Sequence, residues 1–236
     1  MNVIPQRVKH GFVRLLEPLA RALVRGRVHP NFITTFGTAI VVASGAAFGA
    51  GEIRWGGLLL LVSGLFDVLD GQVARLGGMS SIFGAFYDST LDRIGESAVF
   101  AGLALHFMRG GVAPASPTLA VGVALTALAA SLLVSYTRAR AEGLGLECKV
   151  GIAARAERIL LLGVPCLFAP SVTFLFWIVV VLALAAAITV IQRVVHVARL
   201  TRTREGRGGR VVRPHAASLV PRDTLPGVTA FRRKGH

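Results

Sequence analysis

Four aspartates lie in a part of the sequence that is otherwise apolar. Asp67 and Asp70 fall near the end of one hydrophobic run, and Asp88 and Asp92 fall in the next. Carboxylates are costly in apolar surroundings unless a partner compensates their charge. Hard divalent cations are such partners, because Mg²⁺ and Ca²⁺ prefer carboxylate oxygens. No His or Cys accompanies the aspartates, which disfavours zinc.

Helical spacing predicts that the four carboxylates converge. Residues three, four and seven positions apart share one face of a helix, and the turn LGGMSS at 76–81 makes two antiparallel helices neighbours. Such a cluster could hold two cations, an arrangement that stabilises both the attacking and the leaving oxygens in phosphoryl chemistry. The two faces consist of Asp67, Asp70, Gly71 and Ala74 on the first helix and of Gly84, Asp88 and Asp92 on the second.

The elements that must position these residues are membrane helices. The chain of 236 residues is 53% hydrophobic, has only 16% charged residues and has a mean hydropathy of +0.65. A membrane span needs about 20 mostly apolar residues. We therefore predict an all-α integral membrane protein whose six spans lie at 32–50, 56–76, 82–108, 118–138, 156–175 and 177–198.

The net charge of +14 is distributed in a way that predicts topology. Lys and Arg concentrate in residues 1–28, in the loop 139–155 and in residues 199–236, whereas the other connections hold few. Basic loops face the cytoplasm, so both termini and the aspartate turn are expected on the cytoplasmic side of the cell (plasma) membrane. Contact with anionic lipid explains the charge better than nucleic acid, and we predict no nucleic-acid partner.

The regions outside the predicted spans have distinct compositions. Residues 5–27 place Phe12, Leu15, Leu16, Leu19 and Leu23 between arginines, a pattern typical of an amphipathic helix in the membrane interface. The tail at 199–236 is rich in Gly, Pro and Arg and is predicted to be disordered. The domain prediction is therefore an interfacial helix at 1–28, a membrane domain at 29–198 and a basic tail.

The aspartates could also serve a purpose that is not catalytic. A salt-bridge network with Arg75 and Arg93 would leave four acids against two bases. A cation transporter or channel is the main alternative class, since acids within a membrane often mark ion pathways. The outer halves of the first three spans are apolar, which disfavours a transport path. An inactive lipid-binding scaffold would not need all four acids.

The spacing of these residues resembles the signature of the CDP-alcohol phosphatidyltransferase family. Eight signature positions are filled at the intervals of that motif, and the resemblance extends over roughly 28–198. Those positions are Asp67, Asp70, Gly71, Ala74, Arg75, Gly84, Asp88 and Asp92.

The resemblance implies transfer of a phosphatidyl group from a CDP-linked lipid such as CDP-diacylglycerol to an alcohol, with release of CMP. It implies that Asp67, Asp70, Asp88 and Asp92 bind two divalent cations, Mg²⁺ or Mn²⁺, and that Asp92 is also the general base. It further implies a homodimer. The CDP-lipid is expected against Gly71, Ala74, Arg75 and Gly84.

A second stretch, SYTRARAEGLGLECKVGIAARAER at 135–158, bears on the acceptor. Its basic cluster favours a phosphorylated polyol, because arginine binds phosphate oxygens in a fork. The stretch is similar to that of phosphatidylinositol phosphate and archaetidylinositol phosphate synthases, although Arg138 stands where lysine is common. Inositol phosphate is the expected acceptor, and glycerol 3-phosphate, the acceptor of a phosphatidylglycerophosphate synthase, is the alternative. The expected phosphate-binding residues are Ser135, Arg138, Arg155 and Arg158.

Overall fold

The computed structural model describes residues 6–110, 115–152, 155–168 and 171–206. These residues form helices without any strand, as predicted. The helices are α1 (Gln6–Arg25), α2 (Pro30–Ala50), α3 (Ile53–Leu76), α4 (Ile82–Arg109), α5 (Pro117–Gly143), α6 (Arg155–Phe168) and α7 (Val172–Gly206).

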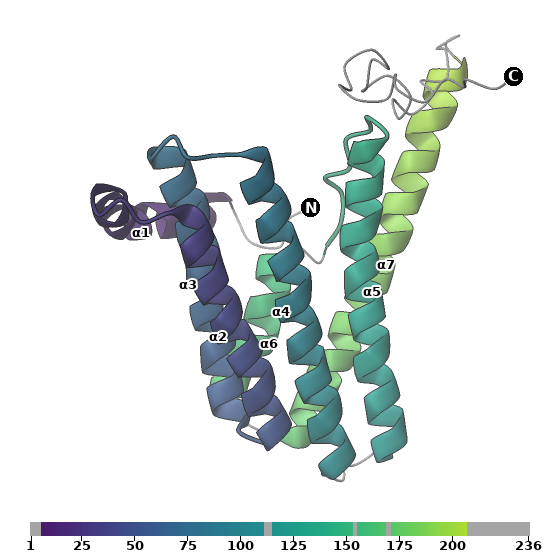
Figure 1. The fold of residues 1–236 in the computed structure, drawn as a ribbon. Helices are drawn as coiled ribbons and strands as arrows, with labels where there is room; N and C mark the ends of the chain where they lie inside the picture. The colour runs from purple at the N-terminus through teal and green to yellow at the C-terminus, as the bar shows by residue number, and fades with distance from the viewer. Residues whose placement is uncertain (1–5, 111–114, 153–154, 169–170, 207–236) are drawn as a thin grey trace, which may run out of the picture.

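Helices α2 to α7 run along one bundle, and α1 lies across it at one end (Figure 1). Helix α2 packs against α3 and α4, α3 against α6, and α5 against α4 and α7. Large side chains such as Phe48, Leu103 and Phe107 fill the core. Gly45 on α2 and Gly102 on α4 meet backbone to backbone, so a side chain at either position would push the two helices apart.

The turn between α3 and α4 uses the local signals that its sequence contains. Gly77 ends α3, and Gly78 has a φ of +63°, a left-handed conformation that glycine adopts without strain. The Ser81 hydroxyl then accepts a hydrogen bond from the Gly84 amide at 2.9 Å and caps α4. The predicted turn is confirmed. The two helices that it joins are not close neighbours, however, because both pack mainly against α2.

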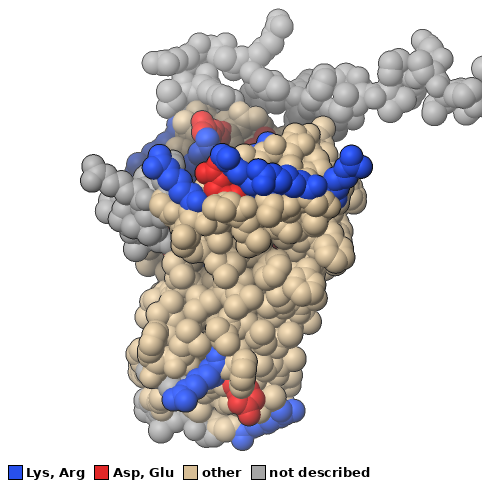
Figure 2. All heavy atoms as spheres, turned by 90° about the vertical axis from the view of Figure 1, so that its left-hand side faces the viewer, with Lys and Arg blue, Asp and Glu red and all other residues tan. Residues whose placement is uncertain are grey.

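Four described helices, α2, α3, α5 and α7, are long and apolar enough to cross a membrane. Helix α4 has 28 residues but carries four charged side chains between Asp88 and Glu96, and α6 has only 14 residues. Figure 2 shows charged residues gathered at the two ends of the visible face, with a band free of charge between them. Four of the six predicted spans are therefore supported by helix length and composition among the described residues.

The boundaries near the C-terminus differ from the prediction. The fifth and sixth spans were expected to divide near residue 176, but α6 ends at Phe168 and α7 begins at Val172. The overlooked signal is Pro170, because proline biases the preceding residue away from helical geometry. Helix α7 also continues to Gly206, into the predicted tail, because Arg and Leu favour helix and no breaker comes before that glycine. The rest of the tail lies outside the described residues.

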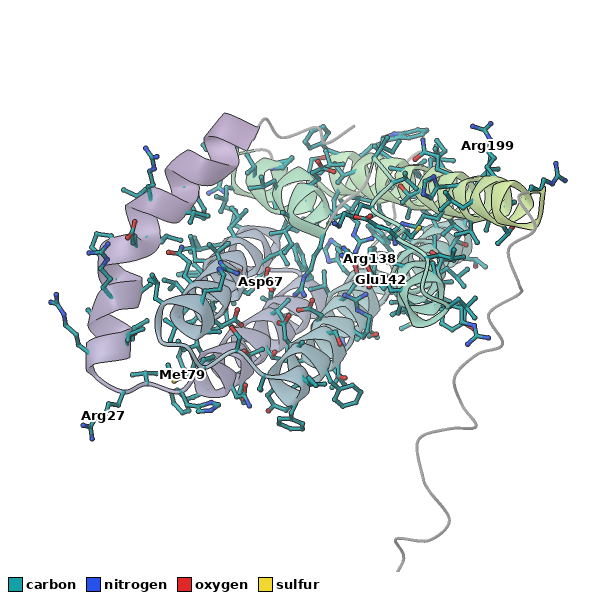
Figure 3. The ribbon with its side chains drawn as sticks, turned by 90° about the horizontal axis from the view of Figure 1, so that it is seen from above. Arg27, Asp67, Met79, Arg138, Glu142 and Arg199 are labelled. Carbon is teal, nitrogen blue, oxygen red and sulfur yellow. The ribbon has the colours of Figure 1, made fainter. Side chains whose placement is uncertain are left out.

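Helix α1 divides its leucines between a small core and the surface. Leu16 and Leu23 pack against a small core that includes Val73 of α3, whereas Leu15 and Leu19 on the same helix are exposed. Seen from above, α1 runs along one edge of the bundle and Arg27, just after it, points outward (Figure 3). The amphipathic, membrane-surface role of α1 stays a prediction.

Candidate active site

Three of the four aspartates form a compact cluster between α3 and α4. One carboxylate oxygen from each of Asp67, Asp88 and Asp92 lies within 4.8 Å of the other two. All three side chains are partly buried, and Asp67 points into the space between the helices (Figure 3). These three carboxylates therefore converge, as the helical spacing predicted for all four aspartates.

Asp70 lies beside this cluster and has a different partner. Its side chain is buried, and its Oδ2 accepts a hydrogen bond from the Thr34 hydroxyl of α2 at 2.7 Å. It nevertheless lines the same small cavity as the three clustered aspartates. The fourth carboxylate is thus oriented by α2 and adjoins the site without belonging to the close triad.

The residues of the cluster suit a divalent cation. Oxygen ligands from three carboxylates match the preference of hard cations, and no His or Cys belongs to the described cluster. Asp88 Oδ1 is buried without a hydrogen-bond partner among the described residues, which is costly unless a positive charge compensates it. Asp67, Asp88 and Asp92 would hold such an ion, with Asp70 beside them.

The first residue of α6 reaches the same cluster. Arg155 Nη1 forms an ion pair with Asp92 Oδ1, and it lies 3.7 Å from Asp67 Oδ1. Both partners are positions at which a cation was predicted. The guanidinium of Arg155 therefore lies in contact with the carboxylate cluster. The sequence predicted this residue only in the acceptor-phosphate site.

A cavity of about 170 Å³ adjoins the aspartates on the side of the α3–α4 turn. Asp70 and Asp88 line both this cavity and the smaller one, so the two cavities adjoin at these residues. A methyl group on Gly84 would come within 3.1 Å of the Ser81 hydroxyl, so the glycine keeps the wall open. The four residues expected to bind the CDP-lipid all line this cavity: Gly71, Ala74, Arg75 and Gly84.

Helix α2 supplies polar residues that the sequence reasoning did not assign. Asn31 and Thr34 line the larger cavity, and Thr34 and Thr38 line the smaller one. Their spacing of three and four residues places them on one helical face. The same periodicity argument that found the aspartates could have found this face.

The residues expected to bind the acceptor phosphate are not gathered in one place. Arg138 donates a hydrogen bond to Glu142 at 2.8 Å, and both side chains are about half exposed at the end of α5 (Figure 3). Ser135 Oγ lies 3.5 Å from the Ser131 carbonyl oxygen. Only Arg155 of the four touches an aspartate, since Arg158 is buried against Glu96 instead.

Two buried charged residues near the site were missed. Glu96 of α4 pairs with Arg158 Nη2 at 2.8 Å. Arg193 of α7 is buried and donates hydrogen bonds to the carbonyl oxygens of Val150, at 3.0 Å, and of Val134. The signal was available for both, because a charged residue inside an apolar helix needs a partner.

Comparisons with known proteins agree with this geometry. Residues 27–198 match the family model described as CDP-alcohol phosphatidyltransferase. The chain is 40% identical over 204 residues to a phosphatidylinositol phosphate synthase of Cutibacterium acnes, covering 80% of this chain and 95% of that protein. It is 38% identical over 186 residues to an archaetidylinositol phosphate synthase of Methanothermobacter thermautotrophicus, covering 78% of this chain and 89% of that protein.

Solved structures are similar as well. A crystal structure of Mycobacterium tuberculosis phosphatidylinositol phosphate synthase with CDP-DAG bound superimposes with a TM-score of 0.68 at 35% identity, covering 78% of this chain and 94% of that one. A second crystal structure of that enzyme, in complex with manganese and citrate, gives a TM-score of 0.67 at 35% identity, covering 76% and 87% of the two chains.

Proposed function

This chain belongs to the CDP-alcohol phosphatidyltransferase family, and from that premise we propose that it transfers the phosphatidyl group of CDP-diacylglycerol to inositol phosphate and releases CMP. The observation that carries the proposal is the meeting of two features at one place. A cavity lined by signature residues adjoins, at Asp88, a cluster of carboxylates that suits a divalent cation. Similar proteins are named phosphatidylinositol phosphate synthase and archaetidylinositol phosphate synthase, and transfer to inositol phosphate would form the product that the first name gives, which supports the acceptor.

The donor is proposed to bind in the larger cavity with its diphosphate toward the aspartates. Gly71, Ala74 and Gly84 leave room for the nucleotide against the backbone, and Arg75 binds phosphate oxygen. Two ions, Mg²⁺ or Mn²⁺, are proposed at Asp67, Asp70, Asp88 and Asp92. Bound there, they supply positive charge to the phosphate oxygens. A solved structure of a similar enzyme with CDP-DAG and another with manganese support this assignment.

Asp92 is proposed to act as the general base. It takes the proton from the acceptor hydroxyl while the hydroxyl oxygen forms a bond to the phosphorus of the phosphatidyl group. The bond from that phosphorus to the oxygen of CMP breaks, and CMP leaves with the bonding electron pair. The place of Asp92 in the carboxylate cluster, beside the proposed acceptor-phosphate residue Arg155, supports this role.

The acceptor phosphate is proposed to bind on the α5–α6 side of the aspartates. Arg155 is the best supported of the four candidates because it already lies at Asp67 and Asp92. Arg138 and Ser135 stand at the end of α5, where a bound phosphate could replace Glu142 as the partner of Arg138. Arg158 is proposed to contribute from its buried place behind Arg155.

The protein is a membrane protein with four clearly apolar helices. We further propose that α4 and α6 also span the bilayer, that α1 lies in the interface, and that the site and both termini face the cytoplasm at the plasma membrane. The gathering of arginines at the end that carries α1 supports this orientation. A homodimer is proposed from the family membership alone, and the basic tail is proposed to contact anionic lipid.

The test is CMP release by purified protein with CDP-diacylglycerol and Mg²⁺ or Mn²⁺. Inositol 1-phosphate, glycerol 3-phosphate, inositol and serine are supplied separately as acceptors. We expect release with inositol phosphate alone. Release only with glycerol 3-phosphate would preserve the site and replace the acceptor. No release with any acceptor, from protein that binds the CDP-lipid, would reopen cation transport as the function of the carboxylates.

A further inference from the structure

A buried polar network lies one helical turn below the aspartate cluster. Glu96 follows Asp92 by four residues on α4, and its side chain is only 12% exposed. Its Oε1 accepts a hydrogen bond from the Ser131 hydroxyl of α5 and pairs with Arg158 Nη2 of α6 at 2.8 Å. Three helices therefore meet at one carboxylate, directly behind the candidate active site.

Arg158 depends on this carboxylate. The residue is 8% exposed, and its Nε and Nη1 have no hydrogen-bond partner among the described residues. A buried guanidinium without a counter-charge is unstable, so Arg158 would seek another carboxylate if Glu96 lost its charge. A cavity of about 40 Å³ lined by Glu96, Arg155 and Arg158 lies beside this side chain, and Arg155 also lines the small cavity at the aspartates.

Arg93 is divided between the network and the cluster. Its Nη2 lies 3.5 Å from Asp92 Oδ2, and its Nε lies 4.0 Å from Glu96 Oε2. Arg93 thus already forms an ion pair with Asp92, and Glu96 shares this guanidinium through a longer contact. The position of this guanidinium is therefore set by two carboxylates, only one of which belongs to the cation site.

We propose that Glu96 is a positioning residue for the cation site. By binding Arg158, it keeps a third guanidinium, in addition to those of Arg93 and Arg155, from pairing with Asp67 and Asp92. Fewer positive side chains then compete with the divalent cation for the oxygens of these aspartates. The inference rests on the proposed function, because it presupposes that the aspartates bind a cation. It assigns a role to a residue that lies outside the eight signature positions and touches no substrate.

The test is Mn²⁺ binding to chelator-treated, purified full-length protein, measured from the free Mn²⁺ signal in electron paramagnetic resonance. We expect Glu96→Gln to bind Mn²⁺ about tenfold more weakly than the wild type, the low end of effects seen for residues behind metal ligands. The thermal midpoint without metal is measured in parallel. Unchanged Mn²⁺ affinity in folded Glu96→Gln protein overturns the inference.

A second variant tests whether Glu96 affects Mn²⁺ binding through its position or only through its charge. Ser131→Ala removes the hydroxyl that holds Glu96 but leaves every charge in place. We expect it to weaken Mn²⁺ binding by about twofold to threefold, the value of one neutral hydrogen bond at its lower end. If Glu96→Gln weakens binding and Ser131→Ala does not, the effect is the long-range field of the carboxylate, and the positioning role is wrong.

The double variant Glu96→Gln/Arg158→Gln keeps the test valid if Glu96→Gln does not fold. It replaces the buried ion pair with two amides that can still hydrogen bond, a change that is often tolerated. We expect its Mn²⁺ affinity to return to within about threefold of the wild type, because no displaced Arg158 competes for the aspartates. A double variant that folds but binds Mn²⁺ tenfold more weakly overturns the inference. A wild-type protein that binds no Mn²⁺ removes the proposed cation site itself.

Discussion

Charged residues lie near both the α3–α4 turn and the α5–α6 connection. Those near the α3–α4 turn lie close together, whereas those near the α5–α6 connection are dispersed. Around the α3–α4 turn, all eight signature residues line two adjoining cavities. Around the α5–α6 connection, the four predicted phosphate-binding residues have separate partners on three different helices. A short turn between two helices fixes relative positions in a way that a long connection does not.

The first experiment tests the well-gathered region and has the largest expected effect. Asp92→Asn should reduce turnover by roughly 10²- to 10⁴-fold, the contribution of a positioned general base. Binding of the CDP-lipid should persist, because the cavity lined by Gly71 and Arg75 is unchanged. Turnover and CDP-lipid binding are measured on the same purified protein. Substantial residual turnover would remove Asp92 as the base.

The second experiment asks whether the scattered region joins the site through Arg155. Arg155→Ala should raise the acceptor KM by roughly tenfold, the value of a charge-assisted contact, and should raise the donor KM less. Steady-state kinetics with each substrate varied in turn provide the measurement. The matched control is Arg140→Ala, since Arg140 is an exposed arginine at the end of α5.

An equal rise of both KM values in Arg155→Ala would mean that the arginine serves the carboxylates and not the acceptor. The contrast between the two regions would then be sharper, because no predicted acceptor residue would touch the reacting groups. A rise in the Arg140→Ala control would instead point to the general positive charge of this surface.

The third experiment returns to the cavity at the α3–α4 turn. In Gly71→Ala the new methyl carbon would lie 3.2 Å from Arg75 Nη1 and displace the guanidinium. We expect the donor KM to rise by about fivefold, equivalent to about 1 kcal/mol of crowding, with little change for the acceptor. Gly122→Ala is the control, because no atom lies within 4 Å of its added methyl group. A donor KM like that of the control would place the donor elsewhere.

The smallest effect is expected at the edge of the scattered region. Arg138 forms an exposed ion pair with Glu142, and such pairs contribute little. Arg138→Lys retains the charge but loses the planar fork, so we expect the acceptor KM to change by about twofold. Glu142→Gln is the companion variant, since it frees Arg138 without altering it. A tenfold change in Arg138→Lys would show that this arginine binds the phosphate directly.

The site around the α3–α4 turn could be predicted from the sequence because it depends on features that are close together along the chain. The period of the helix places Asp67 beside Asp70 and Asp88 beside Asp92, and Gly78 and Ser81 define the turn between the pairs. These few residues determine the cluster without knowledge of the rest of the fold. The orientation of Asp70 by Thr34 was not predicted, because it depends on how α2 packs against α3.

The partners of the arginines could not be predicted by the same reasoning. The pairing of Arg158 with Glu96 joins residues 62 positions apart on α6 and α4, and no periodicity relates their positions. The sequence shows that each charge needs a partner, but the tertiary packing decides which one. For the same reason a basic cluster in the sequence became several separate contacts.

The charged residues of α4 affect how this helix can be inserted into the membrane. Helix α4 is not among the four clearly apolar helices, because Asp88, Asp92, Arg93 and Glu96 fall within its length. Each Asp or Arg at the middle of a helix opposes entry into the bilayer from the translocon by roughly 2.5–3.5 kcal/mol. Helix α3 is apolar enough to enter, and only residues 77–81 separate the two helices. We therefore expect the nascent chain to insert α3 and α4 together as a helical hairpin, so that the turn which assembles the carboxylates also carries α4 into the membrane.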